Sequence, residues 1–454
     1  MRIHFIAIGG SAMHNLALAL HHKGYIISGS DDEIFEPSKT RLKKYGLLPE
    51  NEGWYPAKIT KEIDAIILGM HARKDNPELE KAKELGLKIF SYPEYIYEQT
   101  KDKIRVVIGG SHGKTSITAM ILHVLHYNKM NCDYMVGAQL EGFDTMVKLS
   151  DDATIAILEG DEYLSSPIDR RPKFHLYKPN IALMSGIAWD HINVFPTFDN
   201  YVEQFRIFID LIEKDGSIIY CESDPEVKSI SEAAKRNIKK IPYNIPEHVI
   251  EDGITYLTLT NQKIALQVFG DHNLMNINGA RLVCKELGLS DQEFYNAISS
   301  FKGASRRLEL IVRNEKTAIY KDFAHSPSKL KATTDAVKRQ FPNRKLIACM
   351  ELHTFSSLNE TFLLEYEGAM VKADEALVYY SPHTIAHKKL KPITKEQVVK
   401  AFGGDNVSVF IDSKELVDYL LNKQWSDNNL LLMTSGNFDG IDFKELSESI
   451  IKMK

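Results

Sequence analysis

A short glycine-rich segment carries the residues best suited to phosphate chemistry. From Val106 the sequence reads VVIGGSHGKTSITAMILHVL, so a buried strand would run into a small, polar turn and then into apolar residues at helical spacing. Backbone amides in such a turn converge on phosphate oxygens, and the N-terminus of the following helix adds its dipole. The residues expected to surround the phosphates are Gly110, Ser111, His112, Gly113, Lys114, Thr115 and Ser116, with Lys114 on the β/γ-phosphates and the Thr115 hydroxyl on Mg²⁺.

The same segment also has a plainer interpretation. The general phosphate-loop pattern G-x-x-x-x-G-K-[ST] requires glycine at position 108, where this chain has Ile108. An ordinary tight turn between a strand and a helix, with Lys114 as an exposed lysine, is therefore an alternative. The strand-like IRVVI before the turn and the helical spacing after it favour phosphate binding.

Acidic residues and a histidine follow two further strand-like segments. Glu159, Asp161 and Glu162 come directly after ATIAIL, and Asp190 and His191 follow NIALM by a few residues. Because ligands bind beyond the carboxyl ends of parallel strands, we expect these side chains and the glycine turn to share one sheet edge. Taken singly, acidic loops are usually solvated and a lone histidine is usually structural. Their common placement predicts a Mg²⁺–nucleotide site.

The elements that position these residues alternate along the chain. Strand-like and helix-like segments follow one another throughout, which predicts an α/β fold with parallel sheets. A chain of 454 residues is too long for one core, and we expect three domains, 1–100, 101–307 and 308–454. A helix is predicted from Asn76 to Leu85 and a β-hairpin around Asn261 and Gln262. A further helix is expected to bury the apolar face Tyr201, Phe205, Phe208, Ile209 and Ile212.

Composition and charge exclude several other classes of protein. The net charge of −5 lacks the excess of positive charge that nonspecific nucleic-acid binding requires. The four cysteines form no C-x-x-C pair, which is typical of a reducing compartment and offers no zinc site. No segment reaches the roughly 18 apolar residues of a membrane span, and MRIHFIAIGG is typical of a first strand. We expect a cytoplasmic protein that binds neither nucleic acid nor a membrane.

Along essentially its whole length the chain resembles the Mur ligases, ATP-dependent amide-forming enzymes of bacterial peptidoglycan synthesis. The family turn reads roughly G-T-H-G-K-T-T, matched here by GSHGKTS, and the family also lacks the first phosphate-loop glycine. The resemblance implies ATP and Mg²⁺, a Rossmann-like UDP-binding first domain, a central ATPase domain of the phosphate-loop type and a Rossmann-like C-terminal domain.

The same resemblance implies roles for residues in all three domains. It places Thr115, Glu159 and His191 on the metal, Asn273 and Asn276 of GDHNLMNINGA near adenine, Arg306 and Arg307 of SRRLEL on the ATP phosphates, Asp322 of YKDFAHSP at the ribose and His325 near the substrate. Ser326 stands where relatives have a second histidine.

The first segment resembles the UDP-binding domain of the muramate-binding members of the family. IAIGGSAM would hold the diphosphate on backbone amides and SGSD would lie beside the uridine, although Ala7 and Ala12 replace two family glycines. By spacing alone a dinucleotide site would also fit, but a strict G-x-G-x-x-G is missing. The substrate-binding residues implied are Gly9, Gly10, Ser11, Met13, Ser30, Asp31 and His325.

Two family members use UDP-N-acetylmuramate. One adds L-alanine, and the other recycles the murein tripeptide L-alanyl-γ-D-glutamyl-meso-diaminopimelate. The segment DRRPKFHLYKP matches a D-x-R-x-K-F-x-x-Y-x-P insert of the recycling ligase, and MTSGNFDGI is also closer to that enzyme. His353 is followed by Thr354 and Phe355, whereas both members have an arginine there. We expect the recycling activity, with the alanine ligase as the alternative.

The resemblance implies a reaction through an acyl-phosphate. The lactyl carboxylate of UDP-N-acetylmuramate would attack the γ-phosphate of ATP, and the amine of the peptide would then displace phosphate to form the amide. Lys114 and Arg306 would stabilise charge on the transferring oxygens, and His325 is the candidate base. A nucleotide-binding sensor without this chemistry is the alternative from another class. We expect a monomer or a weak homodimer.

Overall fold

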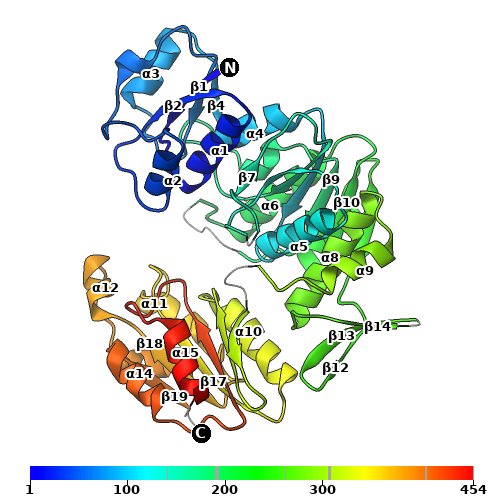
Figure 1. The fold of residues 1–454 in the computed structure, drawn as a ribbon, viewed down its shortest axis with the longest axis vertical. Helices are drawn as coiled ribbons and strands as arrows, with labels where there is room; N and C mark the ends of the chain where they lie inside the picture. Colours follow the sequence, from blue (N-terminus) through cyan, green and yellow to red (C-terminus); the bar gives the residue numbers. More distant parts are fainter. Residues whose placement is uncertain (141, 190–193, 261, 305–307, 404–405, 453–454) are drawn as a thin grey trace. The chain divides into compact units, whose positions relative to one another are not determined.

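The computed structural model describes residues 1–140, 142–189, 194–260, 262–304, 308–403 and 406–452. These residues form two compact units, Met1–Ile245 with Met275–Ile298, and Pro246–Leu274 with Ser299–Lys454. In each unit helices cover parallel β-sheet, as the ribbon in Figure 1 shows. The predicted α/β class is thereby confirmed. None of the helices in the described ranges is long and apolar enough to cross a membrane.

The N-terminal sheet of the first unit is parallel and has the order β2-β1-β3-β4. Ile6 at the end of β1 pairs with Ser30 of β2, so the turn 7–10 and Asp31 follow at the same edge. The strands are β1 (Arg2–Ile6), β2 (Ile26–Ser30), β3 (Ala65–Leu68) and β4 (Ile89–Ser91), and the helices are α1 (Ser11–His22), α2 (Ser38–Lys44), α3 (Pro77–Glu84) and α4 (Tyr92–Thr100). The predicted helix at 76–85 is α3, whose N-cap Asn76 accepts hydrogen bonds from the N–H groups of Glu78 and Leu79.

The central sheet of the first unit has the order β11-β10-β9-β5-β8-β6-β7, with only its edge pair β6–β7 antiparallel among the described strands. Ile108 near the end of β5 pairs with Glu159 of β8 and with Leu183 of β9. The glycine turn, the carboxylates and the segment after β9 therefore leave three adjacent strands at one edge. The strands are β5 (Ile104–Gly109), β6 (Asp133–Met135), β7 (Val147–Lys148), β8 (Ile155–Glu159), β9 (Ile181–Met184), β10 (Ser217–Cys221) and β11 (Lys239–Tyr243).

Helices of the first unit supply the apolar cover of this sheet. They are α5 (Lys114–Tyr127), α6 (Phe198–Asp210), α7 (Pro225–Ala233) and α9 (Asp291–Ile298), with a short 3₁₀ helix at Lys173–Leu176. The predicted apolar face is confirmed, because Tyr201, Phe205, Phe208 and Ile209 of α6, and Ile212 just beyond it, are all buried. Phe208 stacks on Phe174 of the 3₁₀ helix with ring centroids 4.7 Å apart.

A buried arginine joins the N-terminal and central sheets. Arg105 on β5 is 3% exposed and donates hydrogen bonds to five backbone carbonyl oxygens. Three of these carbonyls belong to Thr100, Lys101 and Lys103 at the end of α4 and just beyond it, and two belong to Tyr177 and Lys178. Because the last carbonyls of a helix have no partners within it, the Arg105 side chain satisfies the end of α4.

The second unit begins with three antiparallel strands, β12 (His248–Glu251), β13 (Ile254–Leu259) and β14 (Gln262–Ala265). Leu259 pairs with Gln262, which confirms the predicted hairpin; Asn261 lies outside the described residues. Thr255 of β13 donates to the side-chain oxygen of Gln340 over 2.8 Å. Helix α8 (Asp271–Glu286) contributes residues to both units.

The C-terminal sheet has the order β15-β16-β20-β17-β18-β19, with β15 antiparallel to β16 and the other neighbours parallel. Asp322 at the end of β16 pairs with Met433 of β20, so the site motif YKDFAHSP begins at the carboxyl edge. The strands are β15 (Glu309–Arg313), β16 (Ala318–Asp322), β17 (Lys345–Glu351), β18 (Glu375–Tyr379), β19 (Val407–Phe410) and β20 (Asn428–Met433), and the helices are α10 (Pro327–Gln340), α11 (Glu360–Leu363), α12 (Pro382–His387), α13 (Lys395–Phe402), α14 (Ser413–Leu421) and α15 (Phe443–Lys452).

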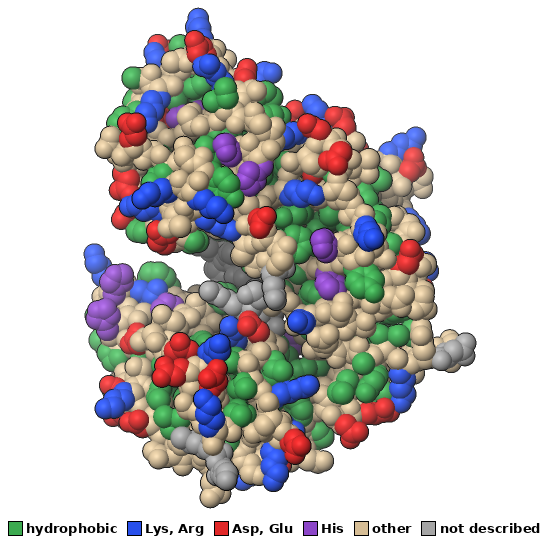
Figure 2. All heavy atoms as spheres, in the orientation of Figure 1, with side chains coloured by type: hydrophobic (Ala, Val, Ile, Leu, Met, Phe, Trp, Pro, Cys, Tyr) green, Lys and Arg blue, Asp and Glu red, His purple; other side chains and the backbone are tan. Residues whose placement is uncertain are grey.

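Most charged side chains of the described residues lie outside these cores, with Glu78, Arg105 and Glu162 among the buried exceptions. Basic and acidic groups are interspersed on the face of the molecule shown in Figure 2. The largest fully buried side chains are aromatic, among them Tyr177, Tyr201 and Tyr366. The four cysteines are buried and free, as their wide spacing in the sequence suggested.

Candidate functional site

The turn between β5 and α5 depends on two glycines in left-handed backbone conformations. Gly110 has φ = 125° and Gly113, the N-cap of α5, has φ = 82°. A Cβ on Gly110 would come within 2.3 Å of the Ser185 hydroxyl, and one on Gly113 within 2.6 Å of the Asn276 side-chain oxygen. Side chains are excluded at both positions, which lets the backbone of the turn pass close to its neighbours.

The segment after β9 fixes the other side of the turn. The Ser185 hydroxyl donates to the carbonyl of His112, and the N–H of Ser111 donates to the carbonyl of Gly186 over 2.9 Å. The Ser111 hydroxyl in turn accepts from the N–H of Ala188 over 2.9 Å. The turn is therefore held from the neighbouring strand end before any ligand is considered.

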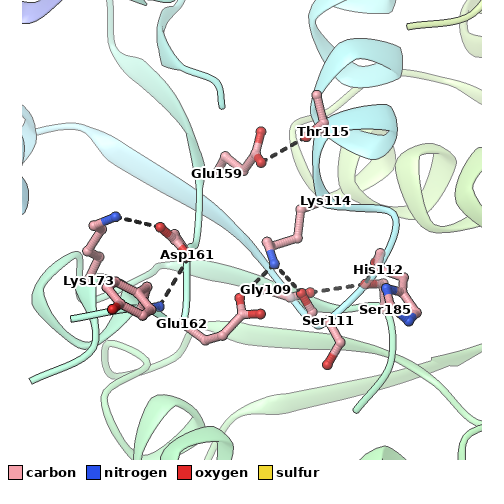
Figure 3. A network of polar contacts seen from close by, with 12 residues as sticks. Gly109, Ser111, His112, Lys114, Thr115, Glu159, Asp161, Glu162, Lys173 and Ser185 are labelled. Atoms are coloured by element: carbon pink, nitrogen blue, oxygen red, sulfur yellow. Dashed lines mark hydrogen bonds and ion pairs between the residues drawn. The ribbon is translucent and has the colours of Figure 1, made fainter. Parts of the chain in front are cut away.

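Lys114 is the first residue of α5, and its side chain lies inside the site (Figure 3). Its ammonium donates to Glu162 Oε2 and to the Gly110 carbonyl, each over 2.6 Å. The side chain is 14% exposed and that of Glu162 is 2% exposed, so Lys114 is not the exposed lysine of the alternative interpretation. Burial lowers the pKa of the Lys114 ammonium, but the charges of Glu162 and Asp161 outweigh burial and leave the pKa raised. Lys114 is charged at any physiological pH.

Glu159 at the end of β8 meets Thr115 of the turn. The Thr115 hydroxyl donates to Glu159 Oε1 over 2.9 Å, and the N–H of Gly137 donates to Oε2 over 2.8 Å. A Cβ on Gly137 would lie 2.7 Å from Oε1, so only glycine allows this approach. Burial raises the pKa of Glu159, and the Gly137 N–H and the charge of Lys114 offset part of that effect.

The two other carboxylates predicted at this edge have partners that sequence reasoning missed. Asp161 pairs with Lys173 over 2.5 Å. Glu162 accepts from the Tyr201 hydroxyl over 3.2 Å, and that hydroxyl also lies 2.9 Å from the Ser111 hydroxyl. Tyr201 was predicted only as part of an apolar face, because helical periodicity reports the buried ring and not the polar tip.

Mg²⁺ suits the oxygen atoms present here. The Thr115 hydroxyl and the Glu159 carboxylate touch one another beside the phosphate turn, and hydroxyl and carboxylate oxygens are the ligands that Mg²⁺ prefers. Asp190 and His191 lie outside the described residues. Within the described part of the chain, no group of three or more His, Cys, Asp or Glu residues is arranged to hold a metal by itself.

The turn after β1 forms a second strand-turn-helix site in the first unit. The N–H of Gly9 donates to Asp31 Oδ2 over 2.7 Å, while Gly10 is the N-cap of α1 and the exposed Ser11 is its first residue. Met13 and Ser30 are buried. Burial raises the pKa of Asp31 to about 6, against the opposing effect of the Gly9 N–H.

The remaining predicted residues lie on α8 and in the second unit. Asn276 of α8 contacts Gly113 of the turn, whereas Asn273 belongs to the second unit and donates to the Phe269 carbonyl over 2.9 Å. Asp322 accepts from the N–H groups of Leu308 and Ala324 over 2.5 and 2.6 Å. Ser116 of the turn is also buried, and Arg306 and Arg307 lie outside the described residues.

His325 has a defined proton position. Its Nδ1 lies 2.8 Å from the Phe323 carbonyl, an acceptor, so Nδ1 carries the proton and Nε2 is the basic nitrogen. The Tyr366 hydroxyl donates to the His325 carbonyl over 2.5 Å and holds the backbone at this point. The ring of Phe323 packs edge-on against the imidazole, with centroids 5.1 Å apart.

Comparison with known proteins covers most of the chain. Residues 2–103 match the catalytic domain of the Mur ligase family, residues 108–284 the Mur ligase middle domain, and residues 306–437 the glutamate ligase domain of Mur ligases. The UDP-N-acetylmuramate–L-alanine ligase of Lactobacillus acidophilus is 29% identical over 441 residues, 93% of both chains. The UDP-N-acetylmuramate–L-alanyl-γ-D-glutamyl-meso-2,6-diaminoheptandioate ligase of Haemophilus influenzae is 26% identical over 462 residues, 99% of both chains.

The fold agrees with these matches. The crystal structure of the UDP-N-acetylmuramate–alanine ligase MurC from Thermotoga maritima superimposes with a TM-score of 0.69 at 18% identity, over 99% of this chain and 98% of that one. The three matched domains follow one another along nearly the whole chain. The chain belongs to the Mur ligase family of ATP-dependent, amide-forming ligases, with their three-domain fold.

Proposed function

We propose that this ligase joins the lactyl carboxylate of UDP-N-acetylmuramate to the amine of L-alanyl-γ-D-glutamyl-meso-diaminopimelate, with ATP converted to ADP and phosphate, in peptidoglycan recycling. The observation that carries the choice of acceptor is the insert DRRPKFHLYKP, which is typical of the tripeptide-adding member of the family. In this chain the insert is part of the carboxylate cluster, because its Lys173 pairs with Asp161 two residues beyond Glu159.

The rest of the insert is firmly built in, which argues against a chance match in a surface loop. Phe174 and Tyr177 are fully buried, and Phe174 stacks on Phe208 of α6. Asp169 and Arg171 form an ion pair at 2.6 Å. The matched residues thus divide between packing the central domain and placing a cation beside Asp161.

ATP is proposed to bind at the turn of residues 110–116. Convergent amides and the N-terminus of α5 favour phosphate oxygens, and the Lys114 ammonium supplies a full positive charge. In the described structure Lys114 holds Glu162 and the Gly110 carbonyl, so a bound phosphate would exchange one anionic partner for another. Asn276 contacts the same turn and is proposed to lie near the adenine, together with Asn273 one helical turn away.

Thr115 and Glu159 are proposed to hold Mg²⁺, together with His191. Mg²⁺ would supply positive charge to the phosphate oxygens. The Gly137 N–H would keep Glu159 Oε2 engaged and so aim the carboxylate. Lys114, with Arg306 and Arg307, would stabilise charge on the oxygens of the transferring phosphoryl group while the substrate carboxylate attacks in line.

UDP-N-acetylmuramate is proposed to bind by its diphosphate at the start of α1, through Gly9, Gly10 and Ser11, with Met13, Ser30 and Asp31 nearby. The incoming peptide amine must lose a proton before it attacks the acyl-phosphate. His325 is our candidate base because its Nδ1–H is fixed on the Phe323 carbonyl, which leaves Nε2 as the nitrogen that can accept a proton. Asp322 is proposed to face the ribose.

The alanine-adding activity is the second candidate, because relatives with that activity are about as similar to this chain as the tripeptide-adding relative is. The Lactobacillus acidophilus relative, an L-alanine ligase, is 29% identical, against 26% for the tripeptide-adding relative of Haemophilus influenzae. The identities are too close to choose between the acceptors, whereas the insert differs between the two kinds of enzyme.

The test is a product assay. The protein is incubated with UDP-N-acetylmuramate, ATP and Mg²⁺, once with L-alanine and once with the tripeptide, and the products are identified by mass. We expect ADP and UDP-N-acetylmuramoyl-tripeptide, with at most trace product from L-alanine. The alanyl product alone would replace the proposal by the second candidate, and ADP release with neither product would reject both.

A further inference from the structure

The loop between β6 and β7 joins the two predicted phosphate sites of the first unit. Val136 donates to the Met146 carbonyl over 3.0 Å and closes the base of the loop. One end of the loop, at Gly137, touches Glu159, the proposed metal ligand. Gln139, Asp144 and Met146 of the loop touch the helices that follow the proposed diphosphate turn.

Arg41 on α2 makes most of the contacts on the side of the N-terminal sheet. Its Nη2 donates to the side-chain oxygen of Gln139 over 2.7 Å and to the Asp144 carbonyl over 2.8 Å. Its Nη1 donates to the side-chain oxygen of Asn15 over 3.2 Å. That oxygen of Asn15 also accepts the N–H of Met146 over 2.9 Å. One guanidinium therefore bridges α1 and the loop with both of its terminal nitrogens.

Arg41 also reaches the diphosphate turn through His14. The Nδ1 atom of His14 lies 3.0 Å from the Gly10 carbonyl, which is only an acceptor, so Nδ1 carries the proton. Nε2 then accepts from Arg41 over 3.4 Å and from Asn15 over 3.0 Å. His14 and Asn15 are buried, so the hydrogen bond between them is shielded from water, whereas Arg41 is half-buried and its bonds to Gln139 and Asp144 are exposed.

At the other end of this series of hydrogen bonds, Gly137 of the loop helps to orient the Glu159 carboxylate. Gly137 lies two residues before Gln139, and its N–H holds Oε2 of Glu159 while Thr115 holds Oε1. A displaced loop would withdraw one of the two donors of a buried carboxylate. Such a displacement would change the orientation of Glu159 toward Mg²⁺ but would leave the turn of residues 110–116 in place.

We propose that Arg41 is a positioning residue that couples sugar-nucleotide binding at the α1 turn to the orientation of Glu159, through the β6–β7 loop. This inference rests on the proposed function, because it assumes a diphosphate at Gly10 and a metal at Glu159. UDP-N-acetylmuramate then tightens binding of the Mg²⁺-nucleotide, and the Mg²⁺-nucleotide tightens binding of the sugar nucleotide by the same factor.

The experiment measures this coupling by calorimetry on the full chain. The affinity for Mg²⁺ and a non-hydrolysable ATP analogue is determined with and without saturating UDP-N-acetylmuramate. We expect about tenfold tightening in the unchanged protein and less than about twofold in Arg41→Ala and in Gln139→Ala. Lys43→Ala is the matched control, since Lys43 is an exposed cation on the same helix, and it should keep the full coupling. Glu159→Gln should weaken the Mg²⁺-nucleotide with or without the sugar nucleotide.

The double variant Arg41→Ala/Gln139→Ala separates coupling from mere loosening of the fold. If both residues act through one contact, the double variant loses no more coupling than either single variant. Additive losses, an uncoupled unchanged protein, or full coupling in Arg41→Ala would each overturn the inference. Failure of the proposed function would look different, since the product assay would then give no UDP-N-acetylmuramoyl-tripeptide.

Discussion

The first unit contains two strand-turn-helix segments, both proposed here to bind an anion, that share one architecture and differ in the charges placed around them. In the central turn a cation is built in: Lys114 lies among Glu162, Asp161 and Glu159 and is held by one of them. In the N-terminal turn no lysine or arginine stands between Ala7 and Met13, and a carboxylate, Asp31, holds the N–H of Gly9. Amides and a helix N-terminus suffice to hold an anion, whereas moving a phosphoryl group calls for concentrated charge that must itself be balanced.

The lysine carries the largest expected difference between the two turns. We expect Lys114→Ala to lower turnover by at least about 10²–10³-fold. Because it also leaves Glu162 buried without its cation, the free energy of unfolding should fall by about 3 kcal/mol. ADP release and chemical denaturation measure the two effects.

A second substitution separates the stability effect from the catalytic one. Lys114→Ala/Glu162→Gln removes the unpaired charge and should recover most of the stability while turnover stays low. Recovery of turnover in that double variant would contradict the role given to the lysine. A Lys114→Ala protein of unchanged stability would contradict the ion pair.

The two turns should also differ in their tolerance of a methyl group. Gly113→Ala forces a left-handed conformation and a contact with Asn276, and we expect a loss of about 1–2 kcal/mol in the free energy of unfolding. Gly10 has φ = −57°, and the nearest atom to an added Cβ is 3.6 Å away, so Gly10→Ala should stay within about 0.5 kcal/mol of the unchanged protein. Equal losses in the two variants would show that the turns are built alike after all.

The smallest expected effect is a pH dependence confined to the N-terminal turn. The pKa of Asp31 is raised to about 6, so the carboxylate becomes protonated as the pH falls through that value. We expect the KM for UDP-N-acetylmuramate to rise below about pH 6, because a neutral carboxyl accepts the Gly9 N–H more weakly than the carboxylate does and so holds the turn less firmly. Steady-state kinetics between pH 5 and 8 should show this rise, and Asp31→Asn should remove it.

Stability should change in the opposite direction at the same group. A raised pKa in the folded protein means that the contribution of Asp31 to stability is fully present below its unfolded pKa and is lost as the pH rises through about 6. The melting temperatures of the unchanged protein and of Asp31→Asn should therefore differ less at low pH than at neutral pH. A KM profile that follows the stability profile would assign the effect to unfolding instead.

Local pattern was enough to predict the parts of the site that lie next to one another in the sequence. Apolar runs ended by glycine or by carboxylates placed β5, α5 and β8 correctly, and parallel pairing then brings Ile108 beside Glu159. The helical spacing of aromatic residues likewise predicted the buried face of α6. These features follow from periodicity and from the short reach of a turn.

Contacts between distant residues could not be predicted in the same way. Lys114 seemed exposed because its partner Glu162 is 48 positions further along the chain, and nothing local marks the pair. In the sequence Gly137 is an ordinary loop glycine, and nothing near it indicates that its N–H donates to Glu159. In a sequence, a tyrosine at helical spacing indicates a buried ring and an arginine indicates a solvated side chain. Neither indicates which distant residue the Tyr201 hydroxyl or the Arg41 guanidinium contacts.

Arg105 has a consequence for how this protein can be divided. The Arg105 side chain donates to carbonyl groups at the end of α4 and to those of Tyr177 and Lys178. It therefore holds the end of the first domain against the central domain. Expressed alone, the first domain would leave the Thr100 carbonyl without its Arg105 donor, and the central domain would keep Arg105 with its partners Tyr177, Lys178 and Glu213 but without the end of α4. We therefore expect the two domains to be most stable when expressed together, and fragments that end or begin near residue 100 to be less stable than the intact chain.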